Sequence, residues 1–339
     1  MPKNVNRQFR LKRRPVGRVE RTDFDLVESA VPTPGPNQAL VRNLYLSLDP
    51  TNRIWMSDMD QYMPPVAIGE VMRGGGIGQV IASNDPAYAT GDLVQGLVGW
   101  QDYVLSGGGE MPLMPLPKGL PVPPTAMLGA LGATGITAYF GLLEIGQPKP
   151  GETVLVSAAA GAVGSVVGQI AKIQGCRAVG IAGSREKCRW ITEELGFDAA
   201  VNYKEPGWRE ALDRACPSGI DVDFENVGGE IMDAVLARMN LHGRVALCGM
   251  ISGYNAGERM LGDYQIILMK RLRVEGFIIL DYLPRFAEAA AVLGGWLVEG
   301  KLKHRETIVE GLENAPAALN RLFDGENMGK LIVKIAEPT

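Results

Sequence analysis

The chain has 339 residues, of which 46% are hydrophobic and 21% charged, and its formal net charge is −4. This balance is that of a folded globular protein, so it excludes a disordered chain and argues against a broad nucleic-acid-binding face. At about 100–200 residues per domain, the length predicts two domains. The four cysteines, Cys176, Cys188, Cys216 and Cys248, form no C-x-x-C pair. We therefore expect reduced thiols and a cytoplasmic protein.

The first 115 residues or so are predicted to be rich in β-strands. Ala39–Leu46 alternates as a strand does, Val71–Ala82 is punctuated by glycines, and Asp92–Leu105 contains two short strands with a turn between them. Short strands with Gly/Pro turns predict a compact, barrel-like β domain. Six prolines between Met111 and Pro124 then mark a domain boundary. The uncharged stretch Gly119–Leu143 is too broken by proline and glycine to span a membrane.

After this boundary the pattern changes to alternating strands and helices, beginning with a helical stretch over Thr125–Ile145. The predicted strands are Thr153–Ser157, Ala178–Ala182, Ala199–Tyr203, Val222–Glu225, Arg244–Cys248 and Val274–Ile279. The predicted helices are Val163–Gln174, Arg185–Leu195, Trp208–Ala215, Ile231–Met239, Gly262–Lys270 and Pro284–Glu299. This order predicts an α/β fold with a doubly wound parallel sheet. The strands near Thr307–Val309 and Leu331–Ile335, with a helix near Asn314–Phe323, are expected to return to the first domain.

Residues 154–172, VLVSAAAGAVGSVVGQIAK, contain the sharpest motif. They match G-x-G-x-x-G with Ala159, Gly161 and Gly164 in the three glycine places, after an apolar strand and at the start of a helix. Gly161 allows the backbone to approach a pyrophosphate, and Gly164 allows the helix to pack closely on the strand. The helix N-terminus then offers N–H groups to the anion. The alternative is a glycine-rich turn in an α/β protein that binds no nucleotide.

The residues after the second strand indicate which dinucleotide is bound. NAD-binding folds place Asp or Glu there to hold the ribose 2′-hydroxyl. Here the strand is followed by Gly183, Ser184, Arg185, Glu186 and Lys187, so Ser184 and Lys187 can hold a 2′-phosphate instead. We predict NADPH. The alternative is that Arg185 and Lys187 are solvated helix charges, although cations in a first helical turn are unfavourable.

Metal ligands are scarce in this sequence. The first cysteine is Cys176, and the two histidines are His242 and His304. The first domain therefore lacks the Cys and His ligands of a catalytic zinc site, and no metal is expected. Without a metal or a histidine acid, the favoured hydride acceptors are enones and quinones, whose products delocalise the charge.

Several motifs together carry a family resemblance: AAAGAVGSVVGQIAK, GS-x-EK, LGFD-x-x-x-NYK, ENVGGE, GRVALCGMIS-x-YN and GENMGK. The chain resembles the zinc-independent medium-chain dehydrogenase/reductases over nearly its whole length. Within them it is similar to the leukotriene B4 12-hydroxydehydrogenase/prostaglandin reductase branch, the alkenal/one oxidoreductases, which includes bacterial curcumin reductases. The resemblance implies a GroES-like β-barrel substrate domain of residues 1–125 and 305–339. It also implies a Rossmann NADPH-binding domain of residues 126–304, with the active site in the cleft between the domains.

The resemblance also implies roles for individual residues. The pyrophosphate would be held by Gly161, Ala162, Val163, Gly164 and Ser165. The adenosine 2′-phosphate would contact Lys187 and Tyr203, and Asn226 would lie beside the cofactor. The nicotinamide ribose side would be lined by Cys248, Gly249, Met250, Ile251, Ser252 and Tyr254. Phe277, Ile278 and Ile279 would present backbone to the carboxamide, and Asn327 would reach the cofactor from the C-terminal segment.

The chemistry of this branch is reduction of the carbon–carbon double bond of an α,β-unsaturated ketone or aldehyde, with hydride added at the β-carbon and a proton at the α-carbon. Tyr254 resembles the family tyrosine near the substrate, where a phenol can hydrogen-bond the enolate and relay a proton. The alternative for Tyr254 is a turn residue that stacks on the cofactor or a loop. Pocket candidates in the first domain are Tyr45, Asn52, Met56, Tyr62, Trp100 and Tyr103, each of which could equally be a core or surface residue.

Two other functions remain open at this point. The first is an NADPH:quinone oxidoreductase on the same scaffold, and the second is a non-catalytic NADPH-binding sensor. From the resemblance we also expect a homodimer, formed by edge pairing of the strand near Val274–Ile279.

Overall fold

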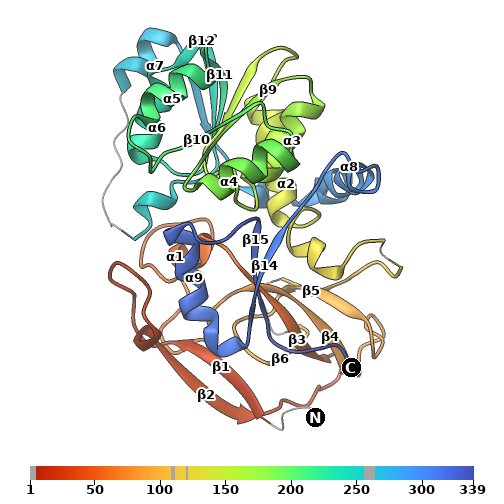
Figure 1. The fold of residues 1–339 in the computed structure, drawn as a ribbon. Helices are drawn as coiled ribbons and strands as arrows, with labels where there is room; N and C mark the ends of the chain where they lie inside the picture. The colour runs from red at the N-terminus through yellow and green to blue at the C-terminus, as the bar shows by residue number, and fades with distance from the viewer. Residues whose placement is uncertain (1–4, 108–110, 120, 256–263) are drawn as a thin grey trace. The chain divides into compact units, whose positions relative to one another are not determined.

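The computed structural model describes residues 5–107, 111–119, 121–255 and 264–339. The chain divides into two compact units, one of Met1–Leu128 with Glu306–Thr339 and one of Gly129–Arg305. Each unit contains its own main sheet (Figure 1). None of the helices in the described ranges combines the length and the apolar character that a membrane span requires.

The first unit is built on antiparallel strands. Within the described residues its main sheet has seven strands: six lie side by side in the order β14-β15-β3-β4-β5-β7, and the seventh, β6, also pairs with β3. Strands β1 and β2 form a separate antiparallel pair. The strands are β1 (Val5–Leu11), β2 (Phe24–Ala30), β3 (Ala39–Leu48), β4 (Gly75–Ser83), β5 (Leu93–Leu97), β6 (Tyr103–Leu105), β7 (Met114–Pro115), β14 (Glu306–Glu310) and β15 (Lys330–Lys334). The helices are α1 (Thr51–Trp55) and α9 (Ala315–Asp324). Because β15 pairs with β3, the C-terminal segment completes this sheet.

The glycines of β4 have a steric cause. A Cβ atom at Gly76 would lie 2.5 Å from the carbonyl oxygen of Tyr45, and one at Gly78 would lie 2.8 Å from that of Arg42. Both neighbours belong to β3, whose register with β4 shifts in this region. The two strands can therefore approach and bend only where the side chain is a hydrogen atom.

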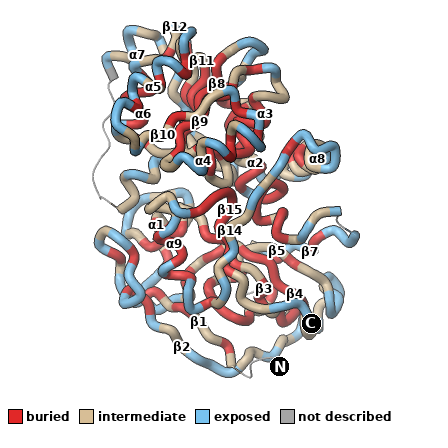
Figure 2. The backbone as a smooth tube through the Cα atoms, viewed as in Figure 1, coloured by how far each residue is buried: buried red, intermediate tan, exposed pale blue. Residues whose placement is uncertain are grey.

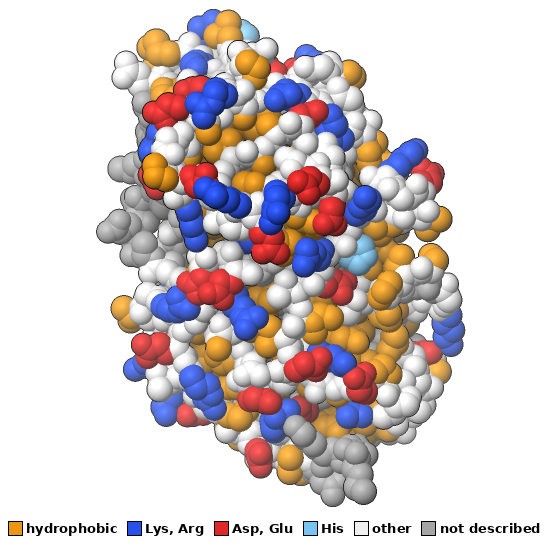
Figure 3. All heavy atoms as spheres, in the orientation of Figure 1, with side chains coloured by type: hydrophobic (Ala, Val, Ile, Leu, Met, Phe, Trp, Pro, Cys, Tyr) orange, Lys and Arg blue, Asp and Glu red, His pale blue; other side chains and the backbone are white. Residues whose placement is uncertain are grey.

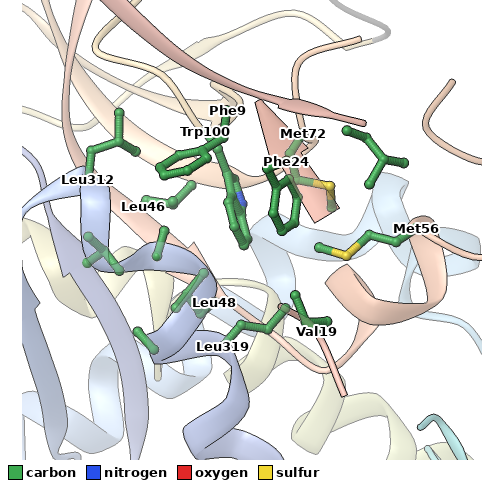
Figure 4. Close-up of a cluster of buried hydrophobic side chains, with 14 of the residues drawn as sticks. Phe9, Val19, Phe24, Leu46, Leu48, Met56, Met72, Trp100, Leu312 and Leu319 are labelled. Atoms are coloured by element: carbon green, nitrogen blue, oxygen red, sulfur yellow. The ribbon is translucent and has the colours of Figure 1, made fainter. Parts of the chain in front are cut away.

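An aromatic cluster forms one core of the first unit (Figure 4). Trp100 is fully buried, stacks on Phe24 with ring centroids 5.5 Å apart, and meets Phe9 edge-on. Leu46, Leu48, Met56 and Met72 pack into the same cluster, as do Leu312 and Leu319 from the C-terminal segment. The N-terminal and C-terminal parts of the unit thus share one hydrophobic core.

The second unit contains a parallel sheet whose order is β10-β9-β8-β11-β12-β13 in the described part of the chain. Its strands are β8 (Thr153–Val156), β9 (Arg177–Ala182), β10 (Ala199–Asn202), β11 (Ile220–Glu225), β12 (Met239–Leu247) and β13 (Arg273–Gly276). Numbered from β8, this order is 3-2-1-4-5-6, the doubly wound Rossmann arrangement. The predicted fold is therefore confirmed, and the switch point lies between β8 and β11.

Helices connect these strands. They are α2 (Ala133–Phe140), α3 (Gly164–Ile173), α4 (Arg185–Arg189), α5 (Trp208–Ala215), α6 (Gly229–Leu236), α7 (Tyr264–Lys270) and α8 (Phe286–Val298). Wider π turns continue α2 over Gly141–Gly146 and α4 over Trp190–Glu194. The interior strands are buried on both faces, as Figure 2 shows for β8 and β11. This burial explains their short apolar runs in the sequence.

Two predicted boundaries are wrong. Strand β12 begins at Met239, where the prediction ended a helix, because Met239 pairs with Ile220 beyond a register shift. Strand β13 ends at Gly276, and Ile279 begins a 3-10 helix, Ile279–Arg285, so Phe277–Ile279 lie outside the sheet. The predicted start of the Gly262–Lys270 helix lies outside the described residues.

Charged side chains of both signs are interspersed over the face shown in Figure 3. Several form ion pairs, such as Arg18 with Asp324 at 2.6 Å and Lys172 with Asp198 at 2.9 Å. The described residues of this face therefore lack the single-sign field that steers a protein to nucleic acid.

Candidate dinucleotide site

The turn between β8 and α3 has the shape of an anion cradle. Ala158 adopts a left-handed conformation with φ of 49°, and its carbonyl oxygen accepts the N–H of Gly161 at 2.9 Å. A Cβ atom at Gly164 would lie 2.5 Å from that oxygen and 2.9 Å from Cα of Ala159, so only glycine fits there. At Gly161 the nearest atom to a Cβ would be the Ala158 oxygen at 3.2 Å. Gly164 is thus needed for packing, whereas Gly161 leaves its backbone open to a ligand.

The missing first glycine of the motif is explained by packing. Ala159 is buried, its N–H donates to the carbonyl of Ile181, and its methyl group packs against β9 at Gly180. The ten-residue helix α3 begins directly after this turn, at Gly164. The N–H groups of Ser165 and Val166 already donate to the carbonyls of Gly161 and Val163, so it is the dipole of α3 that favours a phosphate at this position. The turn therefore fits the pyrophosphate of a dinucleotide.

Lys187, shortly after β9, and Lys204, shortly after β10, lie close together in the region where NAD-binding proteins have a carboxylate. The pKa of Lys187 is lowered, first by burial and then by the positive charge of Lys204. A bound dianion would relieve this repulsion between two ammonium groups. Tyr203 lies beside them, since a Cβ at Gly183 would be 3.2 Å from its hydroxyl and 3.3 Å from Cε of Lys204. This environment fits an adenosine 2′-phosphate.

Two neighbouring residues differ in what they offer to a phosphate. Ser184 caps α4, because its Oγ accepts the N–H of Lys187 at 3.2 Å. Its hydroxyl proton can still be donated to a ligand. Arg185 instead pairs with Glu205 at 2.6 Å, so its charge is already matched. Lys204 was absent from the sequence-based prediction, although it directly follows Tyr203 in the N-Y-K motif.

Asn226 lies at the switch point between β8 and β11. Its backbone N–H donates to Oγ of Ser157 at 2.7 Å, and its Nδ2 donates to the carbonyl of Ser157 at 2.8 Å. These bonds join the ends of the two strands at the place where a doubly wound sheet binds its ligand. Asn226 is therefore rigidly held at the ligand-binding edge of the sheet.

The loop after β12 rests on the turn that contains Asn226. The N–H groups of Cys248 and Gly249 donate to the carbonyl of Glu225, and that of Ile251 donates to the carbonyl of Asn226 at 3.0 Å. Within the loop, the hydroxyl of Tyr254 accepts the N–H of Met250 at 3.1 Å. A phenol can donate as well as accept a hydrogen bond. The hydroxyl of Tyr254 is thus held within the predicted cofactor loop.

Cys248 is unsuited to acid–base or nucleophilic chemistry at neutral pH. Burial, and then the nearby Glu225 carboxyl, raises the pKa of its thiol to about 12. The thiol therefore stays protonated, and the thiolate is the reactive form. Ser252, further along the loop, donates its backbone N–H to the carbonyl of Val227 at 3.1 Å.

The predicted carboxamide-binding segment follows β13. The ring of Phe277 packs edge-on against Phe224 of β11, with centroids 6.2 Å apart. Phe277 also fills the space over Gly141, where a Cβ atom would overlap its ring. The side chain of Phe277 therefore anchors the start of the Phe277–Ile279 segment to the sheet.

The remaining predicted residues belong to the first unit. Asn327 is buried and its Nδ2 donates to the carbonyl of Gly329 at 2.9 Å. Asn52 is also buried and accepts the N–H of Asp49 at 2.8 Å, while the hydroxyl of Tyr62 hydrogen-bonds that of Thr51. Tyr45 is half-buried on β3.

Three further pocket candidates have core positions. Met56 and Trp100 are fully buried in the aromatic cluster. Tyr103 is 3% exposed, and its backbone N–H donates to Oδ1 of Asn6. The side chains of Met56 and Trp100 are used in core packing, and Tyr103 is buried on a paired strand, so the proposed substrate pocket does not include these three residues.

Comparison with known proteins agrees with this geometry. A family model described as the N-terminal domain of oxidoreductase matches residues 7–113, and one described as zinc-binding dehydrogenase matches residues 162–293. The chain is 47% identical to the NADPH-dependent curcumin reductase of Escherichia coli (strain K12), with 98% of each chain covered. It is 42% identical to the NADP⁺-dependent 2-alkenal reductase of Nicotiana tabacum, again over 98% of each. A crystal structure of CurA in complex with NADPH from Vibrio vulnificus superposes with a TM-score of 0.93 at 46% identity, covering 98% of this chain and 100% of that chain.

The fold and the dinucleotide site therefore define a nicotinamide-dependent oxidoreductase. The chain belongs to the medium-chain dehydrogenase/reductases, in the zinc-independent enone reductase branch. Although one matching model is described as zinc-binding, no group of three or more His, Cys, Asp or Glu side chains able to hold a metal occurs among the described residues.

Proposed function

We infer that this protein is an NADPH-dependent reductase of the carbon–carbon double bond of α,β-unsaturated ketones and aldehydes. Full-length similarity to proteins named curcumin reductase and 2-alkenal reductase supports the substrate class. The choice of NADPH over NADH depends on one observation in the structure. Lys187 and Lys204 lie close together where NAD-binding folds have a carboxylate.

We propose that the second unit holds NADPH along the carboxyl ends of its strands. Gly161–Ser165 and the N-terminus of α3 would bind the pyrophosphate. Ser184, Lys187, Tyr203 and Lys204 would bind the 2′-phosphate. Asn226, the Cys248–Tyr254 loop and Phe277–Ile279 would contact the nicotinamide half, and Asn327 would contribute from the first unit. The first unit would supply the substrate pocket, with Tyr45, Asn52 and Tyr62 as its candidate residues.

When bound, NADPH supplies the hydride that adds to the β-carbon of the substrate. The protein must then stabilise the enolate oxygen that this addition creates. The hydroxyl of Tyr254 would donate a hydrogen bond to that oxygen and assist protonation at the α-carbon. The backbone N–H of Met250 would orient the phenol for this role.

Loss of reduced-nicotinamide absorbance tests this function directly. The purified protein would be mixed with NADPH and a medium-chain 2-alkenal, beside parallel reactions with NADH and with a simple quinone. We expect turnover with NADPH and the alkenal. Turnover with the quinone alone would make the protein a quinone oxidoreductase, and tight NADPH binding without any turnover would make it a sensor.

We also propose a homodimer in the cytoplasm. Strand β13 is an edge of the parallel sheet, and its four residues are exposed or half-buried, so its outer side can pair with β13 of a second copy in an isologous interface. The four cysteines are free thiols, which suits a reducing compartment. Sedimentation as a monomer at micromolar concentration would contradict the dimer.

A further inference from the structure

Two acidic side chains lie fully buried on the same face of the central strand β11. Asp223 and Glu225 are two residues apart, so their side chains share one face, and both have 0% exposure. The register places Asp223 between Leu155 of β8 and Val245 of β12, both members of an apolar cluster. The mechanism above assigns these acids no role, and burying two carboxyl groups is costly.

Glu225 organises the turn that carries Asn226. Its Oε1 accepts the hydroxyl of Ser157 at 2.8 Å and the backbone N–H groups of Val227 and Gly228 at 2.5 and 2.8 Å. Helix α6 begins at Gly229, so this carboxylate also lies at a helix N-terminus. Burial raises the pKa of Glu225, but the hydrogen bonds from Gly228, Val227 and Ser157 oppose this shift, so Glu225 is the acid of the pair whose ionised form is stabilised.

The other three carboxyl oxygens of the pair, unlike Glu225 Oε1, lack hydrogen-bond donors among the described residues. Outside the pair itself, no N–H or O–H group of the described residues donates to Glu225 Oε2 or to either carboxyl oxygen of Asp223. Burial is the largest cause that raises the pKa of Asp223 well above its usual range. The neighbouring carboxyl group of Glu225 raises it further. Two adjacent buried carboxyl groups cannot both ionise, so one proton is shared between them. It belongs on Asp223, because the part of the chain that the structure describes offers its carboxyl oxygens no donor that would stabilise a negative charge.

We propose that Asp223 is a positioning residue for the dinucleotide site: as a buried neutral acid it donates to Oε2 of Glu225 and fixes the carboxylate that holds the turn at residues 226–228. That turn accepts hydrogen bonds from the loop of Tyr254, through Ile251 and Ser252. Asp223 would thus help to hold, through Glu225, both the turn that contains Asn226 and the loop that contains Tyr254.

Few other charges act on this pair. The Cys248 thiol at the end of β12 interacts with Glu225 and remains neutral. On the covering helix α6, Glu230 is exposed and pairs with Arg209 of α5 at 2.9 Å. Ionisation of Asp223 would therefore place a second negative charge directly beside Glu225. The turn would loosen, and affinity for NADPH would fall as the pH rises.

The test measures NADPH binding by nucleotide fluorescence, without a substrate. In D223N the amide replaces the hydroxyl donor and cannot ionise, so we expect a Kd within about twofold of wild type at low pH. D223L has no donor and should bind NADPH about tenfold more weakly. A loss of about this size is typical when a residue that orients a ligand-binding group is removed. D221N is the matched control, since Asp221 lies at the other end of β11 and accepts N–H groups of Thr153 and Asn240. Its NADPH affinity should not change.

The pH dependence separates positioning from simple stability. Titration of Lys187 and of the nucleotide phosphate affects wild type and D223N alike, so the Kd of wild type divided by the Kd of D223N isolates the contribution of Asp223. We expect this ratio to rise with pH, because only the wild type gains the second buried charge. A flat ratio, D223L binding as tightly as wild type, or D223N binding as weakly as D223L would each overturn the proposal. If D223L fails to fold, the pH dependence of the ratio of the wild-type Kd to the D223N Kd tests the proposal by itself.

This inference rests on the proposed NADPH site, and the two can fail separately. A wild-type protein that does not bind NADPH would refute the proposed function. A wild-type protein that binds NADPH normally, with variants that bind equally well, would refute only the role of Asp223. Failure to reduce an alkenal would leave the binding test intact.

Discussion

The most specific chemistry at the scale of single residues is the pair formed by Lys187, which follows β9, and Lys204, which follows β10. Lys187 is partly buried near Lys204, and this arrangement holds the pKa of Lys187 below its usual range. Arg185, only two positions before Lys187, is exposed and paired with Glu205. Cations that lie close together in the sequence therefore have different partners in the fold.

We expect K187A to weaken NADPH binding by about 10- to 100-fold, the equivalent of one charge-assisted hydrogen bond worth about 1.5–3 kcal/mol. K204A should have a smaller effect in the same direction, because Lys204 is more exposed. Affinity for NADH, which lacks the 2′-phosphate, should change little in either variant. Fluorescence titration with both nucleotides measures these effects. R185A is the control, and a loss of NADPH affinity in R185A equal to that in K187A would contradict the assignment.

Tyr254 allows a test of the chemical step. Its hydroxyl accepts the N–H of Met250, and a phenol can also donate a hydrogen bond. Y254F should lower kcat for an enone by about 100-fold, as expected on removing a donor to a developing oxyanion, with NADPH affinity nearly unchanged. Steady-state kinetics beside nucleotide binding would measure both. Full kcat in Y254F would remove Tyr254 from the mechanism.

At the scale of elements, close packing of α3 depends on glycine. Gly168 lies on α3 facing the buried ring of Phe197, and a Cβ atom at this position would overlap that ring. Gly295, on α8, is open: apart from its chain neighbours and its own helix backbone, no atom of the described residues lies within 4 Å of the position of a Cβ atom. The two helical glycines thus have opposite surroundings.

We expect G168A to lower the free energy of unfolding by about 1–3 kcal/mol, the usual cost of overpacking a core. G295A should raise it by about 0.5–1 kcal/mol, because alanine restricts the unfolded chain and favours the helix. Urea denaturation of both variants and wild type measures the change. If G168A proved as stable as G295A, the tight contact between α3 and Phe197 would be refuted.

At the scale of the whole molecule, the chemistry is expected to need no metal. The first cysteine is at position 176 and the first histidine at position 242, so residues 1–175 contain none of the Cys and His ligands that zinc dehydrogenase sites use.

Prolonged treatment with EDTA, followed by removal of the chelator, should leave both alkenal reduction and thermal stability unchanged. The measurement is NADPH oxidation before and after treatment, with metal content determined in parallel. Loss of activity that added zinc restores would show that a metal participates.

Much of the fold could be predicted because its signals are local. The strand–turn–helix around Gly161 and Gly164 is a short-range pattern, and the alternation of apolar runs with helices defines the sheet class. The boundaries of β12 and β13 could not be predicted, because they depend on strand partners such as Ile220, about twenty residues before its partner Met239. The burial of Trp100 likewise arises from its contacts with Phe9 and Phe24, some 90 and 75 residues away.

The sequence by itself determined the two-part organisation, the doubly wound sheet, the phosphate-binding turn and the preference for NADPH, since each depends on residue types within a short stretch. Only the tertiary structure decided which charges act together. In the folded protein Lys204 lies near Lys187, and Arg185 forms an ion pair with Glu205. Asp223 is buried beside Glu225, next to the turn that contains Asn226. The physical reason is that electrostatic coupling depends on distance and burial, which arise when separate elements pack and which local patterns do not specify.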